Sequence, residues 1–405
     1  MTSLRERLNA SWGWLLGLYT AASLIETIFY SQLLAFTPLY LPRLGVAETD
    51  IPYFVGMITA LANAIGIPFL PFWGALADRY SRKPIIIRSF VVMMVAGALG
   101  FLASNVWVFV AARAITSFAL GNSGLMMTTL TERLPRNRLG LGFSIMNSAA
   151  PIGAFLGPLI GGPIVDRFGF PTLLVVNTVL LLGVVLGLAL GYRDEFVGRN
   201  TGPLLRMAMQ SFQILWNSRR LRWLFPALFF VFGGWMLSFT YVPIAVTQLY
   251  TGPEPGKAIG LVLGASGVTT LLLSPLLGAL ADRFGQWRLL FIGGVVTLIL
   301  WPIPAFLPDI WSFGVVWALL NGVVSAIFAL SFSVLASSTT DDVRGRVMSF
   351  AYLPANVGFT MGAALGTLIT RSSVFNVFPA SAAMTAFGLL LLYIAYRQPV
   401  LAAAG

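Results

Sequence analysis

Twelve long apolar blocks constrain the fold of this chain more than any other feature of its sequence. Each block is long enough to cross a hydrocarbon core of about 30 Å as a helix. Because 58% of the residues are hydrophobic and only 10% are charged, a water-soluble fold would have too little polar surface. The sequence therefore predicts an all-α integral membrane protein with 12 transmembrane helices. The blocks lie at residues 12–40, 52–77, 84–103, 107–130, 140–165, 171–192, 223–249, 257–281, 289–307, 311–335, 347–370 and 377–396.

The basic residues lie mostly between these blocks, which argues against a nucleic-acid surface despite the net charge of +11. With the N-terminus placed inside, 20 of the 25 Lys and Arg residues fall in cytoplasmic segments. Basic loops tend to stay in the cytoplasm. We therefore expect a multi-pass protein of the cytoplasmic (inner) membrane with both termini in the cytoplasm. The first block is longer than the core of a cleavable signal peptide, so we expect it to be retained.

An internal repeat divides the chain into two parts. The hexapeptide Gly-Ala-Leu-Ala-Asp-Arg occurs at 74–79 and again at 278–283, a shift of 204 residues. A shift of 205 residues places the glycines of the fifth block on those of the eleventh, namely Gly153, Gly157 and Gly161 on Gly358, Gly362 and Gly366. The repeat predicts two parallel six-helix halves, one of the transporter architectures. We expect an N-terminal half at 1–192, a cytoplasmic linker at 193–222 and a C-terminal half at 223–405.

The first copy of the repeated loop is basic and carries one carboxylate. Its chemically distinctive residues are Gly74, Asp78, Arg79, Arg82 and Lys83, and a basic loop with a paired carboxylate is the simplest interpretation. The loop also resembles the signature Gly-x-Leu-Ala-Asp-Arg-x-Gly-Arg-Lys of the major facilitator superfamily. That resemblance implies twelve helices around a central cavity, and a conformational latch in which Asp78 meets basic groups and a helix end from the other half.

Both copies depart from the family signature. Ser81 replaces the glycine of the first copy. The second copy keeps Gly278, Asp282 and Arg283 but has Gln286 and Trp287 in place of the final Arg and Lys. We therefore expect only the first loop to work fully as a latch.

The fifth block carries glycines at helical spacing with a proline among them: Gly153, Gly157, Pro158, Gly161 and Gly162. Small residues at this spacing are typical of close helix packing in membranes. The pattern is also similar to the Gly-x-x-x-Gly-Pro-x-x-Gly-Gly element of the drug:proton antiporter group of the superfamily. Its counterpart in the eleventh block has Ala363 instead of proline, which favours a specialised role for the fifth helix.

Glu26 and Arg113 are the charged residues deepest inside the predicted spans. At about 1.5 Å per residue, Glu26 lies about 21 Å from the inner edge and Arg113 about 9 Å from the outer edge. In a core of about 30 Å these depths coincide. A structural ion pair between the first and fourth helices is one interpretation. The other is that both face a central cavity, which the superfamily resemblance supports, although Ser117 replaces the glycine usual after the fourth-helix arginine.

The repeat separates charge from aromatic character. Under the 204-residue shift Glu26 corresponds to Phe230, and Arg113 corresponds to Trp317. Tyr30 lies one turn from Glu26 and is a further candidate for the site. Other polar residues inside spans are candidates for the cavity wall or for hydrogen bonds between helices: Gln32, Asn63, Asn122, Asn147, Tyr241 and Asn356.

These residues predict a secondary active transporter that works by alternating access, with small molecules, protons and the bilayer as partners and no nucleic acid. Removal from water favours the neutral form of a carboxyl group, so Glu26 is expected to exchange a proton as the cavity opens to each side. The first hypothesis is proton-coupled export of small amphipathic compounds by a monomer. The alternative is a sugar, organic-anion or metabolite carrier, in which Arg113 would meet the substrate directly.

The remaining classes of membrane protein find no support. With no Cys and no His, the chain excludes disulfides, thiolate chemistry and imidazole metal sites. An intramembrane hydrolase would need a nucleophile with a base, so we expect no enzyme, no cofactor and no metal. A sensor would carry a soluble output domain, whereas the longest polar segment is the predicted linker at 193–222.

Overall fold

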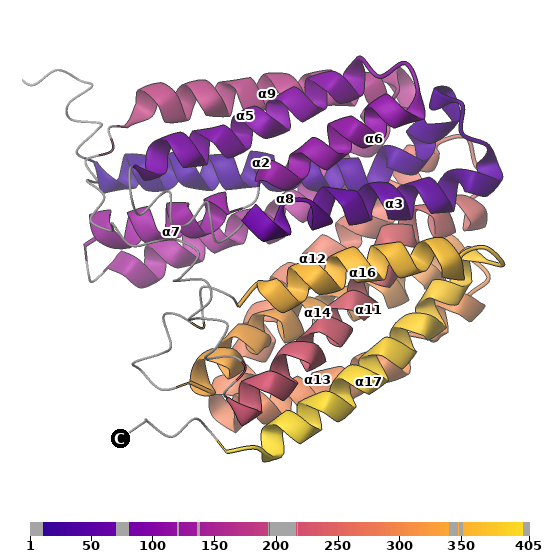
Figure 1. Cartoon of the computed structure of the whole chain (residues 1–405). Coiled ribbons are helices and arrows are strands. Elements are labelled where there is room, and N and C mark those ends of the chain that lie inside the picture. The colour runs from indigo at the N-terminus through magenta and orange to yellow at the C-terminus, as the bar shows by residue number, and fades with distance from the viewer. Residues whose placement is uncertain are drawn as a thin grey trace, which may run out of the picture.

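The computed structural model describes residues 11–69, 81–119, 121–135, 138–192, 218–339 and 351–399, together with residues 194, 216 and 347. Its secondary structure is helical, arranged as two bundles that lie beside each other (Figure 1). Most of the predicted linker at 193–222 and the loop residues Gly74, Asp78 and Arg79 lie outside the described residues.

The N-terminal bundle consists of α2 (Trp12–Tyr40), α3 (Ile51–Ala64), α5 (Arg82–Phe101), α6 (Val106–Ile115), α7 (Asn122–Arg133), α8 (Leu139–Phe168) and α9 (Phe170–Gly191). Short 3-10 turns extend or join these helices: η1 (Leu41–Leu44), η2 (Glu48–Asp50), η3 (Ile67–Phe69) and η4 (Thr116–Ala119). The C-terminal bundle consists of α11 (Arg219–Leu249), α12 (Pro255–Phe284), α13 (Gln286–Leu300), α14 (Ile310–Ser337), α16 (Leu353–Ile369) and α17 (Val377–Arg397), with η6 (Ile303–Phe306) and η7 (Val374–Asn376).

Within the described residues, 11 helical segments are long and apolar enough to cross a membrane, and α16, an apolar helix of 17 residues, supplies the twelfth. Their outward faces carry large exposed apolar side chains, as expected of helices that contact lipid. On α9, for example, Val179 and Leu190 are each 61% exposed. The predicted 12-helix membrane fold is therefore confirmed.

The fourth predicted span, 107–130, is not one continuous helix as we expected. It is divided into α6, the turn η4 and α7, and Gly121 ahead of α7 has a φ of +100°. This left-handed conformation is favourable for glycine and interrupts the helix. The second span breaks at a similar place, because α3 ends at Ala64 just before Pro68, which has no backbone N–H to continue the ladder.

The bundle has two ends that are named here by their connections. The linker end holds the last turn of α9 and the first turn of α11, and the distal end holds the turn from α8 to α9 and the turn from α11 to α12. The two halves approach each other at the distal end and diverge towards the linker end, on the left of Figure 1. The contacts between halves run mainly along two helix pairs, α8 with α12 and α3 with α16, and α2 and α3 also touch α11.

The repeated glycines make equivalent contacts in the two halves. A Cβ at Gly153 or Gly157 would meet the backbone of α2, at Leu24 O and Ile28 O respectively. The equivalent Gly358 and Gly362 lie against the backbone of α11, at Phe229 O and Gly233 O. In each half, therefore, the glycine helix packs closely on the first helix of that half, as small residues in membrane helices do.

Candidate substrate and coupling site

Glu26 lies at the middle of α2, and its side chain faces the broken fourth span. Its Oε2 accepts a hydrogen bond of 2.8 Å from Nδ2 of Asn122, the first residue of α7. The first N–H groups of a helix have no partners within it and carry partial positive charge. The break between α6 and α7 thus places the beginning of a helix beside the Glu26 carboxylate. The hydrogen bond from the Asn122 amide stabilises a negative charge there.

Arg113 lies in the last turn of α6 and is only 7% exposed. Its Nε and Nη1 atoms are buried without a hydrogen-bond partner. The described residues contain no ion pair between Arg113 and Glu26, so the ion-pair interpretation does not hold in this conformation. The guanidinium is therefore a buried cation whose hydrogen-bonding capacity is largely unused, which is expensive unless a ligand or another state employs it.

Tyr30 connects α2 to the same break. Its hydroxyl donates a bond of 3.4 Å to Thr116 O, and Thr116 Oγ1 in turn donates 2.6 Å to Arg113 O. Glu26 and Tyr30 thus face one surface of the fourth span, as their spacing of one turn predicts. The structure brings Glu26, Tyr30, Arg113 and Asn122 into one region of the N-terminal half.

Ser117 joins the breaks in the second and fourth spans. Its Oγ accepts a hydrogen bond of 2.6 Å from the Gly66 N–H and donates one of 3.4 Å to Leu61 O. Gly66 lies just after α3 ends, so the serine satisfies backbone groups that the interrupted helix cannot satisfy itself. Sequence reasoning noted Ser117 only as a departure from the family pattern and missed this role.

α8 has two small-residue faces with different partners. Gly153, Gly157 and Gly161 pack on α2, which agrees with close packing as their function. On the other face, a Cβ at Gly260 of α12 would lie 2.5 Å from Pro158 O, so the two halves meet there backbone to backbone. Gly162 also lies on this second face, where a Cβ would overlap Gly256 O.

Buried polar side chains fix the position of α2 against its neighbours. Gln32 Nε2 donates 2.8 Å to Gly157 O on α8, and its Oε1 accepts 2.7 Å from Asn177 Nδ2 on α9. Gln32 was expected as a cavity or interhelical residue, and it is interhelical. Tyr241 is likewise interhelical, donating 3.1 Å to Ala363 O, whereas Asn63 bonds within its own helix to Thr59 O at 2.8 Å. Asn177 was not anticipated.

The C-terminal half places aromatic rings where the N-terminal half has charges. Trp317, the counterpart of Arg113, is fully buried. Near it, Trp235 on α11 donates 3.0 Å from Nε1 to Asn321 Oδ1, and its ring centroid lies 5.9 Å from Phe328 and 5.7 Å from Phe359. These three rings come from α11, α14 and α16 and are partly exposed. We call Trp235, Phe328 and Phe359 the aromatic cluster.

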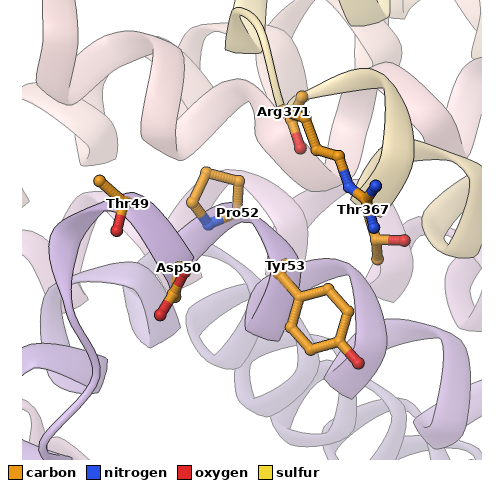
Figure 2. A pocket seen from close by; sticks show the side chains of 7 residues that line it. Thr49, Asp50, Pro52, Tyr53, Thr367 and Arg371 are labelled. Atoms are coloured by element: carbon orange, nitrogen blue, oxygen red, sulfur yellow. The ribbon is translucent and has the colours of Figure 1, made fainter.

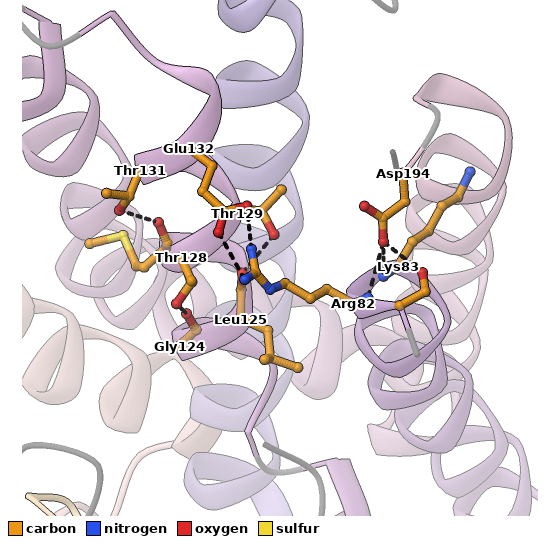
Figure 3. Close-up of polar contacts among 11 residues, drawn as sticks. Arg82, Lys83, Gly124, Leu125, Thr128, Thr129, Thr131, Glu132 and Asp194 are labelled. Atoms are coloured by element: carbon orange, nitrogen blue, oxygen red, sulfur yellow. Dashed lines mark hydrogen bonds and ion pairs between the residues drawn. The ribbon is translucent and has the colours of Figure 1, made fainter. Parts of the chain in front are cut away.

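The described part of the predicted latch loop bonds to described residues of the N-terminal half and to Asp194 of the predicted linker (Figure 3). Arg82 donates two hydrogen bonds to the Glu132 carboxylate of α7, at 2.7 and 2.9 Å. The Arg82 side chain is buried, at 6% exposed, whereas that of Glu132 is 50% exposed. Lys83 Nζ donates to Ala189 O and Tyr192 O at the end of α9, at 2.7 and 2.5 Å. Asp194 accepts from the N–H groups of Arg82 and Lys83, at 3.0 and 3.1 Å.

The second copy of the motif lies in the last two turns of α12, where Asp282 and Arg283 are exposed and Ala281 is buried. Gly278 has no atom near enough to touch an added Cβ, and Asp282 lies on the surface in the last turn of α12. Arg283 lies over the Phe284 ring at 5.3 Å from its centroid. These side chains therefore make no contact with the N-terminal half among the interactions that the structure records.

A polar pocket of about 200 Å³ lies at the distal end between the halves, remote from Glu26. Figure 2 shows Asp50, Pro52 and Tyr53 on one side, with Thr367 and Arg371 on the other. None of the predicted site residues that the structure describes lines it. Within the described ranges, no group of three or more Asp and Glu residues is placed to hold a metal ion.

The family model of the Major Facilitator Superfamily matches residues 18–253 and 250–404 of the chain. A similar curated protein is the "Multidrug resistance protein MdtG" of Serratia proteamaculans, 29% identical over 355 residues, covering 86% of this chain and 85% of that protein. The "Multi-drug resistance efflux pump PmrA homolog" of Lactococcus lactis is 27% identical and covers 84% of each chain.

Solved structures share the fold at low sequence identity. The nucleoside transporter NupG matches with a TM-score of 0.73 at 14% identity, over 95% of this chain and 100% of that one. A bacterial homolog of the human lysosomal transporter Spinster, in an inward-facing and unoccupied conformation, matches with a TM-score of 0.76 at 12% identity, over 95% and 97% of the two chains.

Proposed function

Because the chain belongs to the Major Facilitator Superfamily and is a membrane transporter, we propose that it exports small amphipathic compounds in exchange for protons, by alternating access. The observation that carries the proposal is Glu26. It is the acidic side chain at mid-span, held by a single amide from Asn122 at 2.8 Å and by no ion pair within the described residues. A carboxyl group in that setting can change its protonation without breaking a permanent salt bridge.

The export cycle follows from the charge of Glu26. When the site opens to the cytoplasm, a deprotonated Glu26 attracts a cationic or polar group of the substrate. After the halves reorient, a proton from outside neutralises the carboxylate and weakens that attraction, so the substrate leaves. The proton is released when the site returns to the cytoplasmic side. Each cycle thus moves a proton inward and a substrate outward.

Arg113 and Tyr30 tune this exchange. The buried guanidinium stabilises a deprotonated Glu26 when the two approach and does so less when they separate. Tyr30 donates to Thr116 O beside the arginine, so movement of α2 against η4 changes the separation of Glu26 and Arg113. The aromatic cluster of the other half supplies an apolar surface with one polar edge, suited to the hydrophobic part of an amphipathic substrate.

The loop that contains Gly74, Asp78, Arg79, Arg82 and Lys83 acts in this proposal as the latch of the linker end. Supporting it, Arg82 and Lys83 bond to described residues of their own half while the halves diverge at that end. In the opposite state Asp78 would meet a helix end of the C-terminal half. With the linker end in the cytoplasm, as the basic loops predict, the present conformation is open to the cytoplasm.

The proposed host membrane is the cytoplasmic membrane of a bacterium, which the bacterial relatives support. Both termini would lie in the cytoplasm, and a single chain would hold the complete pathway between its halves, at 1–192 and 223–405.

Glu26→Gln in inverted membrane vesicles tests the function. We expect the variant to lose substrate accumulation driven by a proton gradient, because its side chain cannot change protonation. Exchange of labelled for unlabelled substrate should persist with weaker substrate binding, because the neutral amide attracts the substrate less than the carboxylate does. Glu48→Gln, which changes an exposed carboxyl group of η2, is the matched control and should transport normally. Proton-driven transport by Glu26→Gln at the wild-type rate would contradict the proposal.

A carrier for sugars, organic anions or other metabolites is the second candidate, favoured by the unused Nε and Nη1 atoms of Arg113. Such a site would bind an anionic or hydroxylated solute directly. A panel of cationic, neutral and anionic compounds in proteoliposomes, read by internal pH, distinguishes the two. Saturable, Arg113-dependent uptake of one anionic solute would support this second function.

A further inference from the structure

The distal end contains a polar contact between the two halves that the site does not use. Asp166, in the last turn of α8, accepts hydrogen bonds from two successive backbone N–H groups of α12. Its Oδ1 accepts 2.8 Å from Gly256 N, and its Oδ2 accepts 2.8 Å from Lys257 N. Both donors lie in the first turn of α12, so a carboxylate of one half caps a helix of the other.

α12 depends on this contact because it does not cap itself. The side chain of the residue before the helix, Glu254, accepts no bond from the backbone N–H groups of the first turn, and its carboxylate pairs instead with the side chain of Lys257 at 3.1 Å. Pro255 has no N–H, so Gly256 and Lys257 hold the first free donors of the helix. A negatively charged acceptor at this place is stabilised by both the hydrogen bonds and the helix dipole.

The surrounding glycines allow the approach. A Cβ at Gly256 would lie 2.7 Å from Asp166 Oδ1 and 2.8 Å from Gly162 O. Further along the same pair of helices, a Cβ at Gly267 would lie 2.7 Å from Phe155 Cα. The cap therefore lies at the distal end of a backbone-to-backbone seam that can form only when the halves are closed there.

A repeated tetrapeptide in the sequence contains Asp166. The tetrapeptide Asp-Arg-Phe-Gly occurs at 166–169 and again at 282–285, where it ends α12 at the linker end. In both places the glycine has a positive φ, +81° at Gly169 and +96° at Gly285, which ends the helix just after the carboxylate. The same short sequence thus presents an acidic residue at opposite ends of the bundle, once on α8 and once on α12.

We infer that Asp166 is the latch of the distal end: it stabilises the conformation closed at that end by capping α12 across the interface, and it releases α12 when the halves separate there. Separation leaves both the carboxylate and the two N–H groups to water, so the cap contributes only to the distally closed state. The inference rests on transport by alternating access, but not on the substrate or on proton coupling.

Distance measurements between spin labels test this latch. The chain has no cysteine, so labels can be introduced into the natural sequence. The pair Leu102→Cys and Phe306→Cys reports on the distal end, at side chains that are 69% and 82% exposed. The pair Leu190→Cys and Phe284→Cys reports on the linker end, at side chains that are 61% and 49% exposed.

With Asp166→Ala, we expect the distal distance to lengthen and the linker-end distance to shorten, with the ratio of the two states shifted about five-fold, the usual effect of one helix cap. Asp166→Asn, which keeps one acceptor oxygen but no charge, should shift it less. The reciprocal change at the two ends is the readout, because a purely structural defect would lower thermal stability without moving both distances in opposite directions.

Asp309→Ala is the matched control, since Asp309 caps α14 at the same end with the same chemistry. Its Oδ1 accepts from Trp311 N and Ser312 N at 2.9 and 3.0 Å, but entirely within one half. It should leave both distance distributions unchanged. If Asp166→Ala folds and elutes like the wild type and its distances match those of Asp309→Ala, the latch does not exist. Loss of transport by Glu26→Gln is independent of either result.

Discussion

Ser117 and Asn321 occupy equivalent places in the two halves, 204 residues apart, and both bond to the neighbouring second helix of their half. Ser117 Oγ accepts from the Gly66 N–H at 2.6 Å. Asn321 Nδ2 donates 3.3 Å to Thr270 Oγ1, and Gly66 and Thr270 are also 204 residues apart. The halves thus keep one interhelical bond at the same register, but the N-terminal one reaches backbone and the C-terminal one reaches a side chain.

The difference follows from the state of the helices. In the N-terminal half both partners break, α3 after Ala64 and the fourth span between α6 and α7. In the C-terminal half α12 and α14 run unbroken past Thr270 and Asn321. A broken helix leaves backbone groups that must be satisfied inside the membrane. The half that holds Glu26 and Arg113 is therefore also the half whose helices are interrupted beside them, while the other half has unbroken helices with aromatic rings packed between them.

The largest effect should come from changing the equivalent positions Arg113 and Trp317. Arg113→Met removes the buried cation of the broken fourth span, and under the proposed mechanism we expect proton-driven transport to fall about ten-fold or more, the equivalent of roughly 1.4 kcal/mol. Trp317→Phe removes part of a fully buried ring and should cost about 1 kcal/mol of stability while leaving proton coupling intact. Transport in vesicles measures the loss of activity, and thermal unfolding in detergent measures the loss of stability. Equal losses of transport in both variants would show that the halves are not specialised.

The equivalent glycines give an intermediate effect. An added methyl at Gly362 would overlap the Gly233 carbonyl oxygen, which belongs to the backbone, whereas at Gly157 it would first overlap the Ser31 hydroxyl, which can rotate. Overpacking of this kind costs about 1–3 kcal/mol. Gly362→Ala should therefore lower the thermal midpoint more than Gly157→Ala. The comparison fails if Gly157→Ala is the more destabilising of the two.

The smallest effect should come from Ser117→Ala and Asn321→Ala, since single hydrogen bonds between membrane helices are worth about 0.6 kcal/mol on average. Ser117→Ala strands the Gly66 N–H at the break and should change transport by about two- to three-fold. Asn321→Ala leaves Trp235 Nε1 without its acceptor and should reduce stability without changing the dependence on protons. Transport rates of the two variants, measured together across a pH series, would distinguish a change in transport by Ser117→Ala from an unchanged proton dependence in Asn321→Ala.

Much of this architecture followed from sequence because it depends on local properties. Apolar length fixed the number of spans, and glycine spacing on the fifth and eleventh helices fixed which faces pack closely. The predicted common face of Glu26 and Tyr30 needed only the helical period. The continuous fourth span was wrong, since a left-handed glycine and the carbonyls of a neighbouring helix decide whether a break is tolerated, and neither appears in a hydropathy pattern.

The sequence by itself determined a 12-helix transporter with two related halves and placed its charges in the first of them, because hydrophobic segment length, repeat register and charge position are written along the chain. Tertiary structure alone decided that Glu26 bonds to Asn122 rather than to Arg113, that Ser117 bridges two broken helices, and that Asp166 caps α12 across the interface. Each of these contacts joins residues between 51 and 96 positions apart. Their partners are set by how helices and halves pack, which no single segment encodes.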